Sequence, residues 1–359
     1  MIDAWTWPTY VAVLLGGVLF VALFAPLLAL QSRRFGRLTL SRTIALALFS
    51  VYAVAIVSYT LFPFPERDWC ASHVSPPVQW RPFHSIDDIA GAGSPTSFAV
   101  LQVVFNVVLF VPWGAFVRRY FGWSLVAATG TGFAVSLLVE STQGTGVWGI
   151  YGCAYRVADV DDLLTNTTGA LIGALLAPVL LGWVPPAQED RERRATARPV
   201  TLVRRLAGML IDVMTLYIAS AVLIVTSRSI VHYGLGRPIP TSDQWADQTL
   251  WWAVATVLLV VLPVLFGEPT PGQRAVWLAP AYPVDRIGPR VRRLVAGVGG
   301  WALIELVLNA PPVDCAAATA LEAVSWIWVG ATVLAVVVDP SRRGISFRAA
   351  GADVVDARA

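Results

Sequence analysis

The chain has 359 residues, of which 56% are hydrophobic and only 14% are charged, and its formal net charge is +3. Soluble domains usually carry about 25% charged residues, so the composition excludes an ordinary soluble domain and indicates an integral membrane protein. Every basic residue other than histidine is an arginine, because the sequence contains no lysine.

Nine hydrophobic runs follow one another along the chain, and each is about long enough, or nearly so, to cross about 30 Å of hydrocarbon as a helix. The runs are 10–30, 43–62, 98–117, 122–141, 163–183, 206–226, 249–266, 294–309 and 324–338. The eighth is the weakest, because it is short, rich in glycine and contains Glu305. The predicted fold is therefore all-α and polytopic, with nine transmembrane helices and eight as the alternative. The first run is too long for a signal peptide and no basic residue precedes it, so we expect a retained span.

The placement of arginine predicts the topology. Of the 26 arginines, 21 lie in the segments 31–42, 118–121, 184–205, 267–293 and 339–359, whereas the alternate segments hold the remaining five. Arginines accumulate on the cytoplasmic side of membrane proteins, so we expect the N-terminus outside and the C-terminus in the cytoplasm. The arginines then flank helices at the inner face, and we expect no nucleic-acid-binding patch.

Composition also predicts the domain boundaries. The segment 184–200 is rich in proline and charge and has no apolar periodicity, which is typical of a linker. The predicted parts are a first span with its cytoplasmic loop (1–42), a membrane domain (43–183), a charged cytoplasmic linker (184–200) and a second membrane domain (201–355). We expect the closing residues 348–359 to be mobile. The outer loop 63–97 is long enough to be a tether or a lid, and its composition does not decide between them.

All three cysteines fall in predicted outer segments, where the compartment permits disulfides. Cys70 and Cys153 lie in the two outer loops of the first membrane domain, and they are the candidate pair, although spacing alone does not establish it. The three cysteines, with the three histidines, show no metal-ligand spacing, so no metal or cofactor is predicted.

Polar side chains at membrane depth gather toward the outer ends of three predicted spans. Such residues are costly in lipid and normally pair with one another or face a cavity. Helical spacing places Glu140 beside Gln143, and Asp162 beside Asn166. Together with the adjacent loop, the predicted cluster is Asn106, Glu140, Gln143, Arg156, Asp159, Asp161, Asp162 and Asn166. It is net acidic, and it would suit a proton-transfer group or a cationic or hydroxyl-rich head group.

Each of these residues also has a purely structural explanation. Asp159, Asp161 or Asp162 would cap the helix that begins there. Glu140 would be an interfacial residue in water, and Asn106 would only bond a neighbouring helix. The conjunction across three spans is a stronger signal than any single residue.

Four motifs in the first half resemble the VanZ-like family in their order and spacing. They are "WRPF" (80–83), "NVVLFVPWG" (106–114), "VESTQG" (139–144) and "RVADVDDLLTNTTGALIG" (156–173). The resemblance covers about Thr43–Trp183. It implies a bacterial cell-envelope role of the kind linked to teicoplanin resistance, but it implies no reaction. The family's polar positions fall on Asn106, Glu140, Gln143, Arg156, Asp159, Asp162 and Asn166, and we add Arg81 of the first motif to this ligand-binding set.

In the second half, Asp212 lies inside a span, two turns after Arg205. A carboxyl group there must be protonated, paired or hydrated, and Glu305 and Asn309 in a later span are its candidate partners. An alternative is that Asp212 only makes a structural hydrogen bond to a neighbouring helix.

This half resembles the RDD family of membrane proteins over about Thr201–Val355, through Arg205, Asp212, Thr270 and Gly272. The sequence departs from that family at two places. Gln273 stands where a basic residue is typical, and Phe347 stands where the family tends to close with another aspartate. A family function that requires this aspartate is therefore in doubt here.

Three functions are compatible with these patterns. The first is a bacterial membrane protein whose outward polar site binds or shields a lipid-linked wall precursor, a surface polymer or a glycopeptide. The second is a transporter or ion-coupled carrier that uses Asp212 and Glu305. The third is a scaffold in which these polar residues only pack helices. No nucleophile motif, nucleotide-binding loop or metal-ligand set is apparent, so an enzyme is left open and is not favoured. We expect membrane lipids as partners and no nucleic acid.

Overall fold

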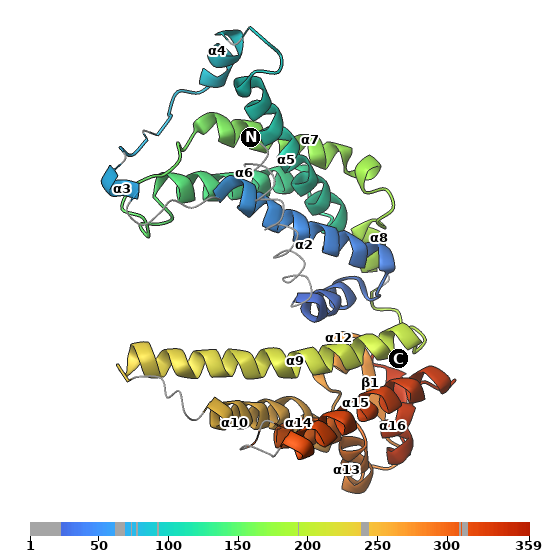
Figure 1. The fold of residues 1–359 in the computed structure, drawn as a ribbon. Helices are drawn as coiled ribbons and strands as arrows, with labels where there is room; N and C mark the ends of the chain where they lie inside the picture. Colours follow the sequence, from blue (N-terminus) through green and yellow to red (C-terminus); the bar gives the residue numbers. More distant parts are fainter. Residues whose placement is uncertain are drawn as a thin grey trace. The chain divides into compact units, whose positions relative to one another are not determined.

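The computed structural model describes residues 23–61, 69–72, 74–76, 78–91, 93–192, 194–237, 244–308, 310 and 315–359. These residues are mainly α-helical, and they divide into two compact units (Figure 1). Unit 1 contains Thr39–Arg191, and unit 2 contains Phe24–Leu38 together with Glu192–Ala359. Residues 24–38, which the sequence analysis grouped with the first span, thus belong to unit 2.

The described residues of unit 1 form four long helices and three short ones. The long helices are α2 (Leu40–Leu61), α5 (Phe98–Tyr120), α6 (Leu125–Gly144) and α7 (Val160–Leu180). The short ones are α3 (Trp69–Ser72), α4 (His84–Gly91) and α8 (Ala187–Glu192). The long helices correspond to the second to fifth predicted spans.

Unit 2 contains further helices and a small sheet. Residues 23–35 are helical. The other elements are α9 (Leu202–Ser229), η1 (Ile230–Gly234), α10 (Gln244–Thr256), η2 (Val257–Val261), α11 (Leu262–Leu265), α12 (Pro271–Ala275), β1 (Leu278–Ala281), α13 (Ile287–Val295), α14 (Val298–Leu308), α15 (Cys315–Val338), α16 (Gly344–Ala350) and β2 (Asp353–Asp356).

Seven helical segments in the described part of the chain are long and apolar enough to cross a membrane. They are 40–61, 98–120, 125–144, 160–180, 202–234, 246–265 and 316–338. The prediction of a mainly α-helical, multi-pass membrane protein is confirmed. Most of the first predicted span lies outside the described residues, and the eighth corresponds to α14, whose 11 residues are fewer than the roughly 20 needed to span a bilayer. The count of nine and the orientation of the termini stay predictions.

Helices α5 and α7 pack against each other (Figure 1). They approach closely because glycines of α7 face the backbone of α5. A Cβ atom at Gly169 would lie 2.1 Å from the carbonyl oxygen of Val107, and one at Gly173 would lie 1.9 Å from that of Val111. Small residues of this kind let membrane helices pack backbone to backbone. The approach brings Asn106 on α5 within reach of the first turn of α7.

The first part of the predicted linker is structured within unit 1. Arg42 at the start of α2 is fully buried, and its Nη2 atom lies 2.9 Å from Oδ2 of Asp190, which is also buried. The same guanidinium donates to the carbonyl oxygens of Pro185 (2.8 Å) and Pro186 (3.3 Å). A buried guanidinium needs such acceptors, so Arg42 holds residues 185–190 against the helical bundle.

The prediction of a mobile C-terminal tail is wrong. Strand β2 pairs antiparallel with β1, with Leu278 opposite Asp356 and Ala281 opposite Asp353. The Asp356 carboxylate is buried and lies 2.9 Å from Nη2 of Arg204 and 2.6 Å from Nη2 of Arg358. Burial alone would raise the pKa of Asp356, but the hydrogen bonds from Arg358 hold it below its usual range. The tail is ordered because a distant arginine pairs with it.

Candidate functional site

The first polar cluster is built on the N-terminus of α7. Asp159 is the N-cap residue, and its Oδ1 atom accepts a hydrogen bond from the Asp161 N–H (2.8 Å). The backbone N–H of Asp159 donates to Oε2 of Glu140 on α6 (3.0 Å), and Glu140 is buried. Two carboxylates thus meet where free N–H groups and the helix dipole favour negative charge. Burial raises the pKa of the Asp159 carboxyl group even so.

The following turns of α7 are bonded to the two neighbouring helices. Asn106 on α5 donates from Nδ2 to Oδ1 of Asp162 (2.5 Å). Asn166, one turn later, donates to the hydroxyl of Ser136 on α6 (2.9 Å). Ser136 in turn donates to the backbone carbonyl of Asp162 (3.5 Å). Three helices therefore contribute to one hydrogen-bonded network.

Asp161 bonds to a different part of the chain and fixes the segment 83–85. Its Oδ1 accepts from the Phe83 N–H (2.6 Å), and its Oδ2 accepts from both the backbone N–H and the hydroxyl of Ser85 (2.8 Å each). Phe83 has a φ of 66°, which is strained for a bulky residue, and its bond to Asp161 supports that conformation. Gln79 also forms an isolated parallel β-bridge with Asp159.

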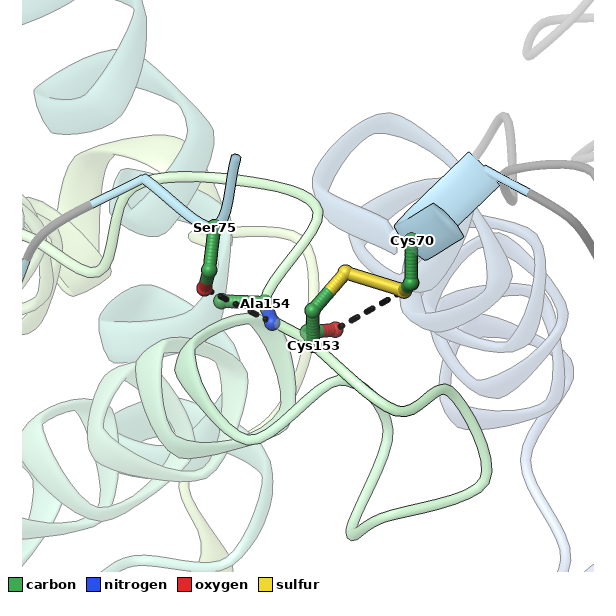
Figure 2. The surroundings of a disulfide bond; sticks show 4 residues. All are labelled: Cys70, Ser75, Cys153 and Ala154. Carbon is green, nitrogen blue, oxygen red and sulfur yellow. Dashed lines mark hydrogen bonds between the residues drawn. A yellow bond between two sulfur atoms is a disulfide. The ribbon is translucent and has the colours of Figure 1, made fainter. Parts of the chain in front are cut away.

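A disulfide joins the same two stretches of chain further from α7. Figure 2 shows Cys70 bonded to Cys153, with a Cα–Cα distance of 5.8 Å. Beside it, the Ala154 N–H donates to the hydroxyl of Ser75 (3.2 Å; Figure 2). The described part of the loop 63–97 is thus fastened to residues 153–161 at several points.

Two other members of the predicted set lie at the end of α2. Gln143 donates from Nε2 to the carbonyl oxygen of Thr60 (2.6 Å), and Arg156 donates to the same oxygen (3.0 Å). The last carbonyls of a helix lack intrahelical partners and carry partial negative charge, which explains why an amide and a guanidinium gather there. Burial lowers the pKa of Arg156. Arg81 instead pairs with Asp87 (3.0 Å), and its side chain is 72% exposed.

Three further polar residues belong to this cluster, and helical spacing from the predicted members points to two of them. Gln102 lies four residues before Asn106 and is close enough to hydrogen-bond to Asp162. Ser136 lies four residues before Glu140 and bonds to Asn166. Ser85 is different: it reaches the cluster from a loop, so no helical period points to it.

The chemistry of this cluster is that of an acidic, hydrogen-bonding site. Glu140 and Asp162 both lie near Asp159, so three carboxylates share one small region. Asp159, Asp162 and Asn106 are partly exposed and can contact a ligand, whereas Glu140 and Asn166 are buried. Among the described residues, no group of three or more Asp, Glu, His or Cys side chains is arranged to hold a metal ion.

In unit 2, three of the four residues predicted there meet at the N-terminus of α12. Asp212 accepts from the Thr270 hydroxyl (2.7 Å) and from the Gly272 N–H (2.7 Å). Thr270 and Gln273 also form a capping box at this helix start. A Cβ atom at Gly272 would lie 1.9 Å from the carbonyl oxygen of Gly208, so glycine is required for the close approach of α9.

Arg205, the fourth predicted residue, is buried and contacts the ring of Phe347. It donates to the carbonyl oxygens of Arg342 (2.9 Å) and Arg343 (3.3 Å), and its guanidinium lies 4.9 Å from the centre of the Phe347 ring. The Arg293 guanidinium lies 5.0 Å from the same ring centre. Phe347, at the position where an aspartate was expected, therefore contacts two buried cations.

Glu305 does not bond to Asp212, its predicted partner. Glu305 accepts hydrogen bonds from Ser325 (2.6 Å) and Tyr217 (3.4 Å), whereas the partners of Asp212 are those at α12. The other predicted partner, Asn309, lies outside the described residues. Asp212 and Glu305 nevertheless both line one cavity of about 910 Å³.

The geometry defines an all-α, multi-pass membrane protein with an acidic cluster in its first unit. Residues 49–181 of this chain match a family model described as VanZ/LLP1. The matched region contains the network of α5, α6 and α7, so the predicted resemblance of the first half is confirmed. Searches of curated proteins and of solved structures gave no match. The resemblance of the second half to the RDD family stays a prediction.

Proposed function

We propose that unit 1 binds or shields the polar head of a lipid-linked wall precursor or surface polymer at the outer face of a bacterial cell membrane. The observation that supports this most is the meeting of Glu140, Asp159 and Asp162 at the start of α7. The similarity of residues 49–181 to VanZ/LLP1 proteins supports the cell-envelope setting.

The chemistry of the cluster favours hydroxyl-rich or cationic head groups. Carboxylates accept hydrogen bonds, and the Asn106 amide is itself engaged with Asp162, so the partly exposed edge of the site is rich in acceptors. Sugar hydroxyls and ammonium groups are the donors that such an edge would bind. A scaffold that only packs helices would not need partly exposed carboxylates on Asp159 and Asp162.

The test uses substitutions that keep the hydrogen bonds and remove the charge. Glu140→Gln still accepts from the Asp159 N–H, and Asp159→Asn still caps α7. In bacterial cells made glycopeptide-tolerant by this protein, we expect each variant to lower tolerance to the level of cells that lack the protein. Membrane insertion should be unchanged. Glu268→Gln, an exposed carboxylate of unit 2, is the matched control. Full tolerance in both charge-removing variants would contradict the proposal.

Transport by unit 2 is the second candidate function, and the shared cavity of Asp212 and Glu305 favours it. Intramembrane carboxylates that face a cavity are typical of ion and proton pathways. We expect Asp212→Asn to abolish ion or proton flux in vesicles that contain the purified protein. Asp353→Asn, whose side chain is exposed, should leave the flux unchanged. Wild-type flux in Asp212→Asn would exclude a role for Asp212.

A further inference from the structure

The cavity of unit 2 is amphipathic. Most of the residues around it are apolar, and Val213, Trp301, Val329 and Val333 are among them. Arg205 and Arg293 also line it, and both are buried, with 4% and 3% of their surface exposed. The cavity volume of about 910 Å³ falls in the range of sites that hold small organic ligands.

The two guanidiniums are held mainly by neutral groups. Arg205 donates to two backbone carbonyls, and Arg293 donates to Oε1 of Gln273 (2.6 Å), the Tyr282 hydroxyl (2.8 Å) and the carbonyl oxygen of Glu268 (3.4 Å). Within the described parts of the chain, neither forms an ion pair with a carboxylate within 4.0 Å. A guanidinium carries five N–H donors, so each retains donors for a ligand.

The carboxylates whose charge acts on Arg205 are those of Asp212 and Asp339. Both oxygens of Asp212 accept hydrogen bonds from the start of α12. Asp339 pairs with Arg348 (3.0 Å) and accepts from the backbone N–H groups of Ser341, Arg343 and Gly344. The Phe347 ring attracts both cations, but an aromatic quadrupole carries no net charge. Asp212 carries one negative charge and faces two guanidiniums, so this end of the cavity keeps an excess of positive charge. Glu305 and Glu322 also line the cavity, and Glu305 bonds to Ser325 and Tyr217.

We propose that the Arg205–Arg293 end of the cavity binds the anionic head of a single-chain amphiphile, a carboxylate or phosphate whose hydrocarbon tail lies along the apolar wall. Buried charges are stable when they are paired, and guanidinium matches carboxylate and phosphate oxygens in a two-pronged geometry. Trp301, Val329 and Val333 supply the surface that a tail would cover. The proposal goes beyond the function of unit 1, and it does not require unit 2 to transport.

The binding test measures separately how the head group, the hydrocarbon tail and the charge of a ligand contribute to its affinity. The purified full chain in a neutral maltoside detergent is titrated calorimetrically with dodecyl phosphate, kept below its own micelle concentration. We expect saturable binding at least about tenfold tighter than that of inorganic phosphate, which lacks the tail, or dodecyltrimethylammonium, which reverses the charge. If either of these two control probes bound as tightly as dodecyl phosphate, the proposal would be overturned. Palmitoyl lysophosphatidate in a nanodisc bilayer tests whether the ligand is a lipid. If neither dodecyl phosphate nor palmitoyl lysophosphatidate binds, the proposed site is overturned.

Four substitutions, two tests and two controls, locate the binding site of the head group. Arg293→Gln should weaken dodecyl phosphate binding at least about tenfold, whereas Arg292→Gln, its exposed neighbour on α13, should not change it. Phe347→Asp puts a fixed carboxylate at a ring that both guanidiniums contact, so it should abolish binding. Phe347→Leu, which adds no charge, should keep it. If Arg293→Gln and Phe347→Asp both bind like the wild type, the anion does not lie between these arginines.

Discussion

In each unit an aspartate bonds to a helix N-terminus, but the charged residues around this aspartate have opposite signs in the two units. In unit 1, Asp159 caps α7 from its own N-terminus, and in unit 2, Asp212 on α9 bonds to the N-terminus of α12. Around Asp159 the neighbours are the carboxylates of Glu140 and Asp162. Around Asp212 they are the guanidiniums of Arg205 and Arg293.

This difference shows that a capped carboxylate does not by itself define a site. Capping satisfies the oxygen atoms of the aspartate and the free N–H groups of the helix, and it explains why an aspartate stands there. The ligand preference comes from the charged groups beside the cap, since their charge is not used by the helix. An acidic surplus in unit 1 suits donors and cations, and a basic surplus in unit 2 suits anions.

The largest effect is expected where the helices of unit 1 meet. Gly173→Leu would place a side chain against the Val111 carbonyl, which lies 1.9 Å from the site of the added Cβ atom, so α5 and α7 must separate. We expect a loss of stability of at least about 3 kcal/mol, and the Asn106–Asp162 bond should break. Gly130→Leu on α6 is the control, because nothing lies within 4 Å of its added Cβ. Thermal unfolding in detergent measures both, and similar melting temperatures for the two variants would contradict the packing argument.

A smaller loss of stability is expected when either Asp161 or Asp212 is substituted. Each of these carboxylates bonds a predicted span to another segment of the chain. Asp161→Asn and Asp212→Asn each remove a charged acceptor, which typically costs about 1–3 kcal/mol. We expect Asp212→Asn to lose more stability, because the hydrogen bonds of Asp212 are buried and its charge partly balances two arginines. The hydrogen bonds of Asp161 are only partly buried. Unfolding of the two purified variants under the same conditions gives the order. A larger loss in Asp161→Asn would reverse the comparison.

Much of the fold and part of the acidic cluster were predictable from the sequence. Hydropathy locates α2, α5, α6 and α7, and helical spacing relates Asp162 to Asn166. The glycine spacing of Gly169 and Gly173 is visible in the sequence, but its partner helix is not. Which carbonyl each glycine approaches depends on tertiary packing, and no local rule supplies it.

The interactions that the sequence did not reveal join residues far apart in the chain. Arg42 pairs with Asp190, 148 residues later, and Arg204 pairs with Asp356. Composition identified the partners only as charged residues of a linker and a tail, where solvated charge is the normal expectation. Arg293 was overlooked for a similar reason: α13 carries several arginines, and only the fold shows that this one is buried.

The smallest expected effect is a difference in pH dependence between the units. The pKa of Asp159 is raised by burial, so its charge destabilises unit 1 as pH rises from its ordinary value of about 4 through the raised value. The pKa of Asp356 is lowered by its arginine partners, so its contribution is complete above about pH 4 and is lost as pH falls through the lowered value. One pKa unit corresponds to about 1.4 kcal/mol, and the partial exposure of Asp159 reduces its share.

The two variants should therefore respond in different pH ranges. Relative to the wild type, Asp159→Asn should gain stability between about pH 4 and neutral pH, because it removes a charge whose desolvation is unfavourable. Asp356→Asn should be destabilised at neutral pH, and its deficit should shrink only below about pH 4. Melting temperatures across this range measure both responses. If the two variants changed with pH in the same direction over the same range, the contrast between a desolvated cap carboxylate and an arginine-paired carboxylate would not hold.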